Sequence, residues 1–294
     1  MLDLKKIFTP TETKKQHTIK QHFIPQVYIK RFYNESFKVF RHDVKNNRTK
    51  EFTSSQIFYE PELYNLVYKQ KIFRDIENSY SDLESMLGNI YEAIDAPAFL
   101  KNIKENKALN KSIFLFFKTV ISYQYFRTKD IDYRSFIPHS TALTDIYRYR
   151  EKYIRDNFSF IKKKDLKYIQ KKVTKNLGNN EQAVKVLVKG LQLIILPILL
   201  TNFISTRLKI HRYEKKCIIS CDKPIICKSR SDLYNLQNFI YPLSPDVIIY
   251  AEGNEITSSL IQNSEAVNQL IFNNADKYII SHDKKIIDGI RNKK

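Results

Sequence analysis

Glycine and tryptophan are scarce in this chain, whose 294 residues include 5 Gly and no Trp. The phosphate-binding loops of nucleotide-dependent enzymes and the dinucleotide-binding fold require clustered glycines, and the sequence contains no such cluster. It also lacks the nucleophile elbow of α/β-hydrolases and the His-Glu-x-x-His helix of zinc proteases. These absences exclude the enzyme classes that depend on those motifs.

Cysteine is equally rare, and all three cysteines fall in one short segment: Cys217, Cys221 and Cys227. An odd, clustered set argues against a disulfide framework and is typical of a reducing compartment, so we expect a cytoplasmic protein. His211 completes a candidate zinc-ligand set, but the short paired spacings of structural zinc sites are missing. Two His-Asp pairs, at 42–43 and 282–283, follow predicted strands and are typical of turns. We therefore expect no metal and no cofactor.

Long apolar runs are missing as well. The longest, residues 190–205, is shorter than the roughly 20 residues that cross a bilayer, and it contains Pro197 and Asn202. The first residues show no apolar region of the signal-peptide type. We expect a buried helix bent near Pro197 and no stable membrane insertion.

Positive charge is abundant: 50 Lys and Arg against 31 Asp and Glu give a net charge of +19. Such an excess predicts a polyanionic partner, and we expect nucleic acid, with RNA favoured over DNA. Cations and tyrosines alternate in one segment, where we predict the phosphate contacts: Arg148, Arg150, Lys152, Arg155, Lys162, Lys163 and Lys164. The alternatives are a solvated helix face and a lysine excess caused by AT-rich codon usage.

The hydrophobic pattern predicts an α+β fold with a mainly helical centre. We expect a flexible basic arm over residues 1–20 and a single domain over residues 21–294. Near the start, spacing and alternation predict a short helix at 22–32 and a hairpin at 37–53. In the centre, apolar residues at helical spacing predict helices at 70–105, 109–128, 142–158, 164–177 and 187–208.

The pattern changes again towards the C-terminus, where strands should form a small sheet. Strands are predicted at 216–220, 246–250 and 277–281, and a helix at 258–274. Asp222-Lys-Pro224 and Pro242–Pro245 are expected to be turns between elements.

Four short motifs occur in a fixed order: Gln21-His22-Phe-Ile-Pro25-Gln-Val-Tyr28-Ile-Lys-Arg-Phe32, Gln124-x-x-Arg127-Thr128, Cys221-Asp222-Lys223-Pro224 and Pro242–Pro245. Together they resemble bacterial proteins that share the domain of unknown function numbered 4238, which open with His-His-x-x-Pro-x-x-Tyr-Leu-x-x-Phe. The resemblance spans residues 21 to 281 and implies candidate positions, but no reaction. Gln21 replaces the first histidine of that pattern, and Cys221 and Lys223 replace the Ser and Asn beside the turn aspartate.

The motifs contribute four polar residues from distant parts of the chain: His22, Gln124, Arg127 and Asp222. A fold that gathers one site from separate elements produces such a pattern. Because RNA supplies its own 2′-hydroxyl nucleophile, a ribonuclease needs only a proton-transfer group and a cation. We predict a metal-independent RNase of toxin or phage-defence type, in which His22 transfers protons, Arg127 stabilises the phosphorane and Asp222 orients His22.

The alternative is a non-catalytic module that binds nucleic acid or a partner protein, with the same four residues in structural roles. His22 would cap the first helix, Gln124 would satisfy backbone groups and Asp222 would shape an Asx turn. Arg127 could form an ion pair with Asp222. A metal-dependent enzyme with His22 and Asp222 as ligands is the third hypothesis.

Overall fold

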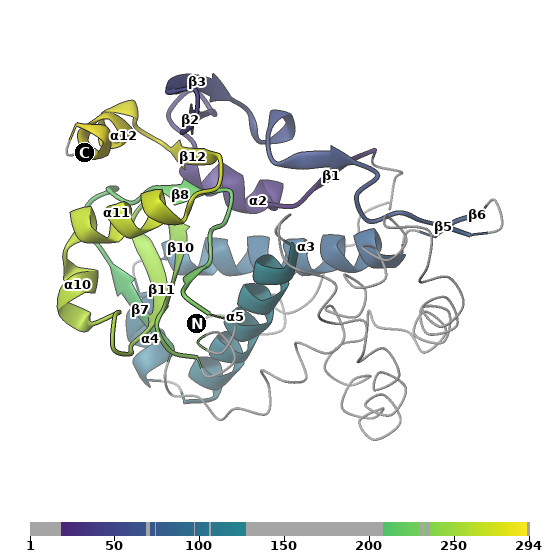
Figure 1. The fold of residues 1–294 in the computed structure, drawn as a ribbon. Coiled ribbons are helices and arrows are strands. Elements are labelled where there is room, and N and C mark those ends of the chain that lie inside the picture. The colour runs from purple at the N-terminus through teal and green to yellow at the C-terminus, as the bar shows by residue number, and fades with distance from the viewer. Residues whose placement is uncertain are drawn as a thin grey trace. The chain divides into compact units, whose positions relative to one another are not determined.

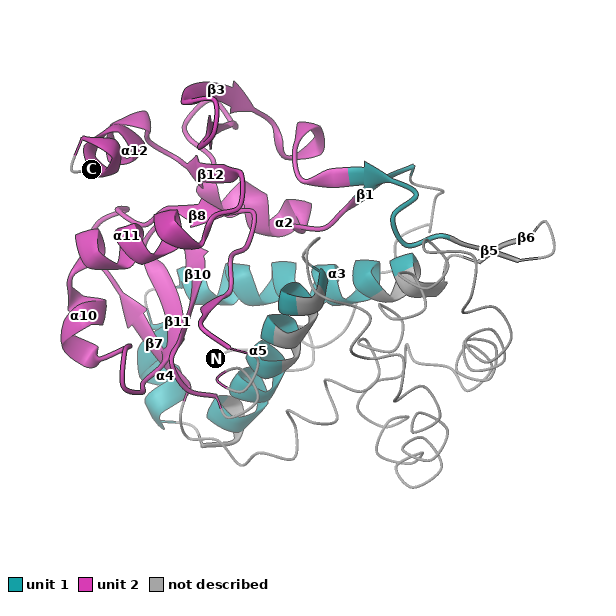
Figure 2. Cartoon of the chain, in the orientation of Figure 1, with its two compact units in different colours: residues 1–21, 60–202 teal, residues 22–59, 203–294 magenta. Residues whose placement is uncertain are grey.

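The computed structural model describes residues 19–68, 71–73, 75–96, 98–105, 107–127, 208–229, 232 and 236–292. The chain divides into two compact units, each discontinuous in sequence (Figure 2). Unit 1 contains residues 1–21 and 60–202, and unit 2 contains residues 22–59 and 203–294. The two units thus alternate along the sequence. Whether residues 21–294 behave as one domain stays a prediction.

Strands outnumber helices among the described elements, so the predicted mainly helical centre is wrong. The described part of the chain contains twelve strands in four sheets and seven α-helices (Figure 1). Most of these strands are only two to five residues long. A periodicity of two cannot be detected over two or three residues, which is why the sequence pattern missed the shortest strands. The helices expected at 142–158 and 164–177, and residues 187–207 of the next, lie outside the described residues.

In unit 1, three helices follow one another: α3 (Asp75–Asp95), α4 (Phe99–Glu105) and α5 (Lys107–Arg127). They confirm the helical spacing seen before residue 128, although the helix predicted at 70–105 is two helices, α3 and α4. The chain before α3 is a hairpin instead of helix: β5 (Leu66–Tyr68) and β6 (Lys71–Phe73). The apolar face of α3 is buried, through Leu83, Leu87, Ile90 and Ile94. Each such side chain stabilises the fold by roughly 1.5–3 kcal/mol.

Two short strands lie where the chain passes between the units. They are β1 (Lys20–His22) and β4 (Tyr59–Pro61), which form a two-stranded sheet. Phe23 and Phe58 continue this pairing inside unit 2, since the Phe23 amide donates to the Phe58 carbonyl over 2.9 Å.

Two four-stranded antiparallel sheets form the framework of unit 2. The first has the order β7 (Leu208–Arg212), β11 (Val247–Ala251), β10 (Phe239–Ser244), β9 (Ile226–Cys227). The second has the order β3 (Arg48–Phe52), β2 (Val39–Asp43), β12 (Tyr278–Ser281), β8 (Ser220–Cys221). The second sheet therefore joins the hairpin near the N-terminus to strands near the C-terminus.

These sheets test the strand predictions individually. The hairpin at 37–53 and the strands at 246–250 and 277–281 are confirmed to within about two residues. Of the strand expected at 216–220, only Ser220 pairs. The turn expected at Pro242–Pro245 lies later, because residues 242–244 belong to β10 and the turn to β11 is made by Pro245 and Asp246. Strand β9 pairs with Phe239 and Ile240 of β10 but not with Pro242, and the register between β10 and β11 shifts after Pro242. Pro242 is thus at an irregular position with one unpaired side, where a strand tolerates proline.

Two short helices near the C-terminus, α11 (Ser264–Asn274) and α12 (Lys284–Arg291), cover one face of the second sheet. The predicted helix at 258–274 is two helices, α10 (Ser258–Gln262) and α11, because Asn263 ends the first and its side chain caps the second. Helix α12 was not predicted, and the Asp283 carboxylate caps it. Ile271, Ile287 and Ile290 pack with Ile279 and Cys221 of the sheet in one core.

No helix among the described residues is long and apolar enough to cross a membrane. The buried helix expected at 190–205 and the arm at residues 1–18 lie outside the described part of the chain. The fold discussed below is therefore that of the remaining ranges.

Candidate functional site around Arg127

Arg127, the last residue of α5, lies in a buried group of charged and aromatic side chains in unit 1. Its Nη1 is 2.6 Å from Oε1 of Glu84 on α3, and its Nε donates to the Tyr64 hydroxyl over 3.2 Å. The guanidinium also lies 4.1 Å from the ring centroid of Tyr80. Together with Glu77, these residues form the Arg127 cluster: Tyr64, Glu77, Tyr80, Glu84 and Arg127.

The cluster keeps a positive charge in an apolar setting. Arg127 is 3% exposed, and burial alone would lower its pKa. The attraction of Glu84, together with Tyr64 and Glu77, outweighs burial and raises the pKa of Arg127 above its ordinary value. The guanidinium therefore stays charged, stabilised by one carboxylate and stacked on an aromatic ring.

Glu77 is the member of the cluster with unused hydrogen-bonding capacity. Residues 77 and 84 are two helical turns apart, so Glu77 and Glu84 lie on the same face of α3. The Glu77 Oε2 atom is buried and has no hydrogen-bond partner within the described residues. Burial, followed by repulsion from Glu84, raises the pKa of Glu77 to about 7, against the attraction of Arg127. Both protonation states of Glu77 are therefore populated near neutral pH.

The tyrosines connect the cluster to the first sequence motif. The Tyr64 amide donates to Oε1 of Gln21 over 2.5 Å, and Nε2 of Gln21 donates to the Asn65 side chain over 2.7 Å. The rings of Tyr64 and Tyr80 have centroids 4.7 Å apart. Burial raises the pKa of both tyrosines, so their hydroxyls remain protonated. Gln21 stands where the family pattern has its first histidine. Through its hydrogen bond to the Tyr64 amide, it positions the tyrosine that accepts a hydrogen bond from Arg127.

The structure divides the four predicted site residues between the units. Gln124 and Arg127 are both buried and one turn apart on α5 in unit 1, so they share a helix face. His22 and Asp222 belong to unit 2. The gathering of all four in one site stays a prediction.

His22 contacts a carbonyl in unit 2. Its Nε2 atom is 3.2 Å from the Ser54 carbonyl oxygen, and its ring centroid is 5.6 Å from that of Tyr59. Helix α2 (Gln26–Ile29) begins after Pro25 with no side-chain hydrogen bond at that N-cap, and the capping role of His22 stays a prediction. The proton-transfer role of His22 stays a prediction.

Asp222 accepts hydrogen bonds from three consecutive backbone amides. Its Oδ1 accepts from the amide of Asp276 over 3.0 Å, and its Oδ2 from the amides of Lys277 and Tyr278 over 2.8 and 3.1 Å. Burial raises the pKa of Asp222 even though these three hydrogen bonds lower it. The carboxylate thus fastens the end of β8 to the start of β12, which is a longer-range role than the Asx turn expected from Pro224.

The other candidates for chemistry have local roles. The Cys221 thiol is buried, donates to the Lys223 carbonyl over 3.1 Å and has a pKa raised by burial. Nδ1 of His42 lies 2.9 Å from the Thr49 hydroxyl. Within the described ranges, no three His, Cys, Asp or Glu side chains are grouped as metal ligands would be. The basic segment from Arg148 to Lys164 lies outside the described residues.

Sequence reasoning identified Arg127 but missed its partners Glu77 and Glu84. A signal was present, because Tyr80 and Leu87 mark the buried face of α3. Counting back three residues from Tyr80 gives Glu77, and counting forward four gives Glu84, so both carboxylates occupy positions of the apolar stripe. Acidic residues at such positions need a buried partner, and this one lies on a different helix.

A family model matches residues 20–285, nearly the whole chain, and confirms the resemblance seen in the motifs. Comparisons with curated proteins and with solved structures give no significant match. The chain belongs to the family described as protein of unknown function DUF4238.

Proposed function

We propose that this protein is a metal-independent ribonuclease of toxin or phage-defence type whose reacting groups come from the Arg127 cluster. The supporting observation is the position of Glu77, a carboxyl group with one oxygen lacking a hydrogen-bond partner in the described residues, beside a permanently charged arginine. Its pKa of about 7 suits a group that must both take up and release a proton near neutral pH. The net charge of +19 favours a polyanionic substrate.

The reaction balances with groups that the cluster holds. The 2′-oxygen of RNA attacks the adjacent phosphorus, the bond from phosphorus to the 5′-oxygen breaks, and a 2′,3′-cyclic phosphate is left. Ionised Glu77 accepts the 2′ proton, and the carboxylic acid so formed donates it to the departing 5′-oxygen. Arg127 opposes the extra negative charge of the phosphorane through the low-dielectric surroundings.

Access to the cluster is on the side of its carboxylates. Arg127 is 3% exposed, whereas the Glu84 side chain is 25% exposed, and Glu77 is also partly exposed. A phosphate would therefore meet the α3 carboxyl groups first. The reaction requires Glu77 to be the group in contact and Arg127 to act electrostatically.

Glutamine and alanine variants separate this proposal from the one based on His22. Glu77→Gln should lower the cleavage rate of a labelled RNA by about 100-fold or more, the range expected for loss of a general acid–base. Glu92→Gln is the matched control, because Glu92 is an exposed glutamate on the same helix. The wild-type rate should be unchanged by EDTA, and the product should carry a cyclic phosphate.

Each other outcome is decisive. Full activity in Glu77→Gln with loss in a folded His22→Ala would transfer the role to His22. Inhibition by EDTA would replace the mechanism by a metal-dependent one. If the RNA stays intact with the wild type and with every variant, the ribonuclease hypothesis is rejected and the non-catalytic binding module is favoured.

A further inference from the structure

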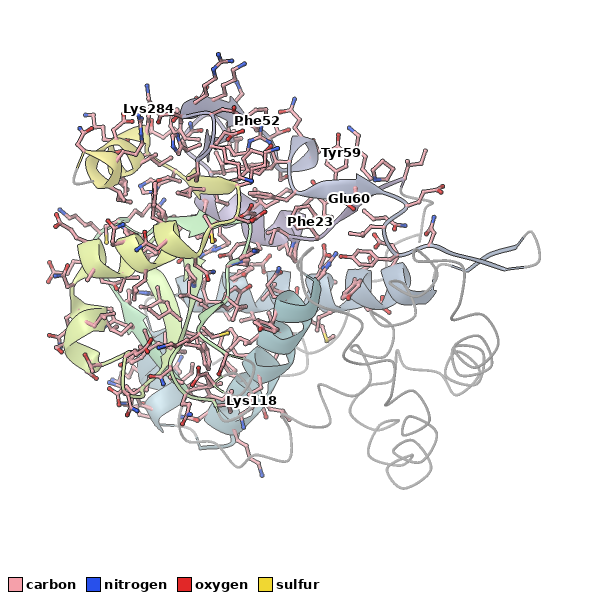
Figure 3. The ribbon with its side chains drawn as sticks, in the orientation of Figure 1. Phe23, Phe52, Tyr59, Glu60, Lys118 and Lys284 are labelled. Carbon is pink, nitrogen blue, oxygen red and sulfur yellow. The ribbon has the colours of Figure 1, made fainter. Side chains whose placement is uncertain are left out.

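A second arginine, Arg41 in unit 2, lies between two aromatic rings. Its guanidinium carbon is 4.0 Å from the ring centroid of Phe52 and 4.2 Å from that of Tyr278. Phe52 is on β3 and Tyr278 on β12, so the two rings come from the strands on either side of β2. Figure 3 labels Phe52 on the hairpin. The arrangement fixes the plane of the guanidinium.

The strand register defines the face to which Arg41 belongs. Arg41 is directly opposite Lys50, Val39 opposite Phe52, and Asp43 opposite both Arg48 and Tyr278. Residues at directly opposite positions share a face. The partly or fully exposed members of this set form the Arg41 face: Arg41, Asp43, Arg48, Lys50, Phe52 and Tyr278.

The opposite face of the same sheet is covered by helices. It includes Phe40, Ile279 and Cys221, which pack against α11 and α12. The Arg41 face near β3 has no such cover among the described residues, since Arg48 and Lys50 are exposed. Further along this face, the Tyr28 hydroxyl lies 2.6 Å from Ser220 Oγ. The Ser220 end of this face is therefore covered by Tyr28, and the part around Arg41 is the part of the described face that is open to a ligand.

The Arg41 guanidinium has no hydrogen bond or ion pair to the described residues, and burial lowers its pKa against the effects of Tyr278 and Asp43. Ring stacking compensates only part of the lost hydration of a guanidinium, and its N–H groups are strong donors. A half-buried arginine that is held in place but not hydrogen-bonded is prepared for an acceptor from outside the protein. The fork of N–H groups fits a phosphate.

Like charges around Arg41 strengthen this conclusion. Arg41 and Lys50 are directly opposite on neighbouring strands, an arrangement that destabilises a sheet when it is not neutralised. The Lys277 ammonium lies 4.9 Å from the Tyr278 ring centroid, so two cations share one ring. Asp43 is the single acidic member of the face, and its carboxylate already accepts from the amides of Lys45 and Asn46. An anion binding here would relieve the repulsion.

Tyr278 contacts a ring inside the fold, that of Phe58, which is 5% exposed. The Phe58 ring is 6.2 Å from that of Tyr278 and 5.8 Å from that of Phe23. Phe58 has a φ angle of 60°, a left-handed conformation that is strained for a bulky residue. Cations interleaved with partly exposed aromatic rings are the combination with which proteins follow single-stranded nucleic acid.

We propose that the Arg41 face binds the phosphodiester backbone of single-stranded RNA, with the outer edge of the Arg41 guanidinium donating to a phosphate. The choice of RNA rests on the proposed function, but binding and cleavage are measured separately. Arg48 and Lys50 contact neighbouring phosphates, and the partly exposed rings contact the bases.

The test is a salt titration of binding to a labelled 2′-O-methyl oligonucleotide of about a dozen nucleotides, read by fluorescence anisotropy. The 2′-O-methyl group prevents cleavage, so the result does not depend on the RNase proposal. Arg41→Gln should weaken binding by about 10-fold at low salt and reduce the slope of log affinity against log salt by about one. Arg41→Lys should keep the slope but bind more weakly than the wild type, because lysine lacks the planar fork.

Two further variants make the result decisive. Lys284→Gln is the matched control, because Lys284 is an exposed cation on α12, which covers the opposite face (Figure 3). It should leave the slope unchanged. Lys50→Gln removes an exposed cation without a described partner, so it should lower the slope by about one without affecting folding.

The inference is overturned if the protein does not bind the oligonucleotide at low salt, or if Lys284→Gln weakens binding as much as Arg41→Gln. It is also overturned if Arg41→Gln and Lys50→Gln both bind like the wild type. If the protein cleaves natural RNA and Arg41→Gln binds like the wild type, the Arg41 face is rejected as the binding surface and the RNase proposal stands. If Arg41→Gln weakens binding but the protein cleaves no RNA, the RNase proposal is rejected and the Arg41 face stands.

Discussion

Arg127 and Arg41 are both withdrawn from water, but their surroundings differ. Arg127 is 3% exposed, forms an ion pair with Glu84 at 2.6 Å and donates to Tyr64. Arg41 is half-buried, stacks on Phe52 and Tyr278, and has no ion pair within the described residues. The protein itself satisfies the first guanidinium, whereas the second retains its donors for another molecule.

This difference shows that stacking and ion pairing contribute in different ways. A cation over an aromatic ring gains about 0.5–2 kcal/mol and keeps its N–H groups. A buried ion pair uses them, and removing one partner leaves a charge that the protein cannot solvate. Mutation of Arg127 should therefore lower the stability of the protein, whereas mutation of Arg41 should weaken its binding.

The largest effect is expected at Arg127. Arg127→Gln should lower the free energy of unfolding by about 3 kcal/mol, because Glu84 then loses its partner in a mostly buried site. Urea denaturation at pH 7 measures the loss. The control is Lys101→Gln, which breaks an exposed pair with Glu105 and should cost less than about 0.5 kcal/mol. Equal losses in the two variants would contradict the buried character of the Arg127 cluster.

Glu77 should make the stability of the cluster depend on pH. Its pKa is about 7 in the folded protein and 4.5 ordinarily, so the folded state binds more protons between these values. The contribution of Glu77 is therefore fully present below pH 4.5 and is lost as pH rises to about 7. Glu77→Gln should abolish this loss and stabilise the protein at pH 8 by on the order of 2 kcal/mol.

Thermal unfolding of wild type and Glu77→Gln at pH 5 and pH 8 tests this sign. Glu92→Gln is again the control, since that exposed side chain should change neither curve. The measured quantity is the difference in stability between the wild type and Glu77→Gln. If this difference is the same at pH 5 and pH 8, the Glu77 carboxyl group is not held in an apolar site.

Asp222 extends the comparison to a buried anion satisfied by the backbone. Asp222→Asn removes the charge and leaves one carbonyl oxygen for three amides, so we expect a loss of about 1–3 kcal/mol. Hydrogen exchange should accelerate at the amides of Asp276, Lys277 and Tyr278 in particular. Unchanged protection at these three amides would show that Asp222 does not hold β12 in place.

The smallest effect on stability is expected at Arg41. Arg41→Gln removes two cation–ring contacts but also the repulsion from Lys50, so the free energy of unfolding should change by less than about 1 kcal/mol. Urea denaturation alongside Arg127→Gln measures both on one scale. A loss as large as that of Arg127→Gln would make Arg41 a structural residue and erase the contrast.

Local patterns predicted what local forces determine. The alternation of apolar and polar residues predicted the β2–β3 hairpin at 37–53, because a hairpin pairs residues that are close in sequence. The spacing of α3 and α5 was equally visible. Strand β8 has two residues and pairs with β12, whose partner residues lie about sixty positions away, so no local window contains its signal.

The candidate site was predictable only in part, for a related reason. Arg127 could be identified because a motif contains it, but its selection of Glu84 depends on how α3 and α5 pack. The ion pair expected between Arg127 and Asp222 was inferred from their opposite charges alone, because the sequence does not give the distance between them. Arg41 could not be identified as a binding residue, because its position between Phe52 and Tyr278 exists only once β12 has joined the hairpin.

The sheet order β3-β2-β12-β8 has a consequence for synthesis of the protein on the ribosome. The β2–β3 hairpin leaves the ribosome early, but its partner strand β12 begins at Tyr278, more than two hundred residues later. At the usual rate of about 5–20 residues per second, β2 presents an unpaired edge to solvent for roughly ten to fifty seconds. Unit 2 thus cannot complete its second sheet until Ser281 has been synthesised, and the nascent hairpin is the segment that a chaperone would need to shield.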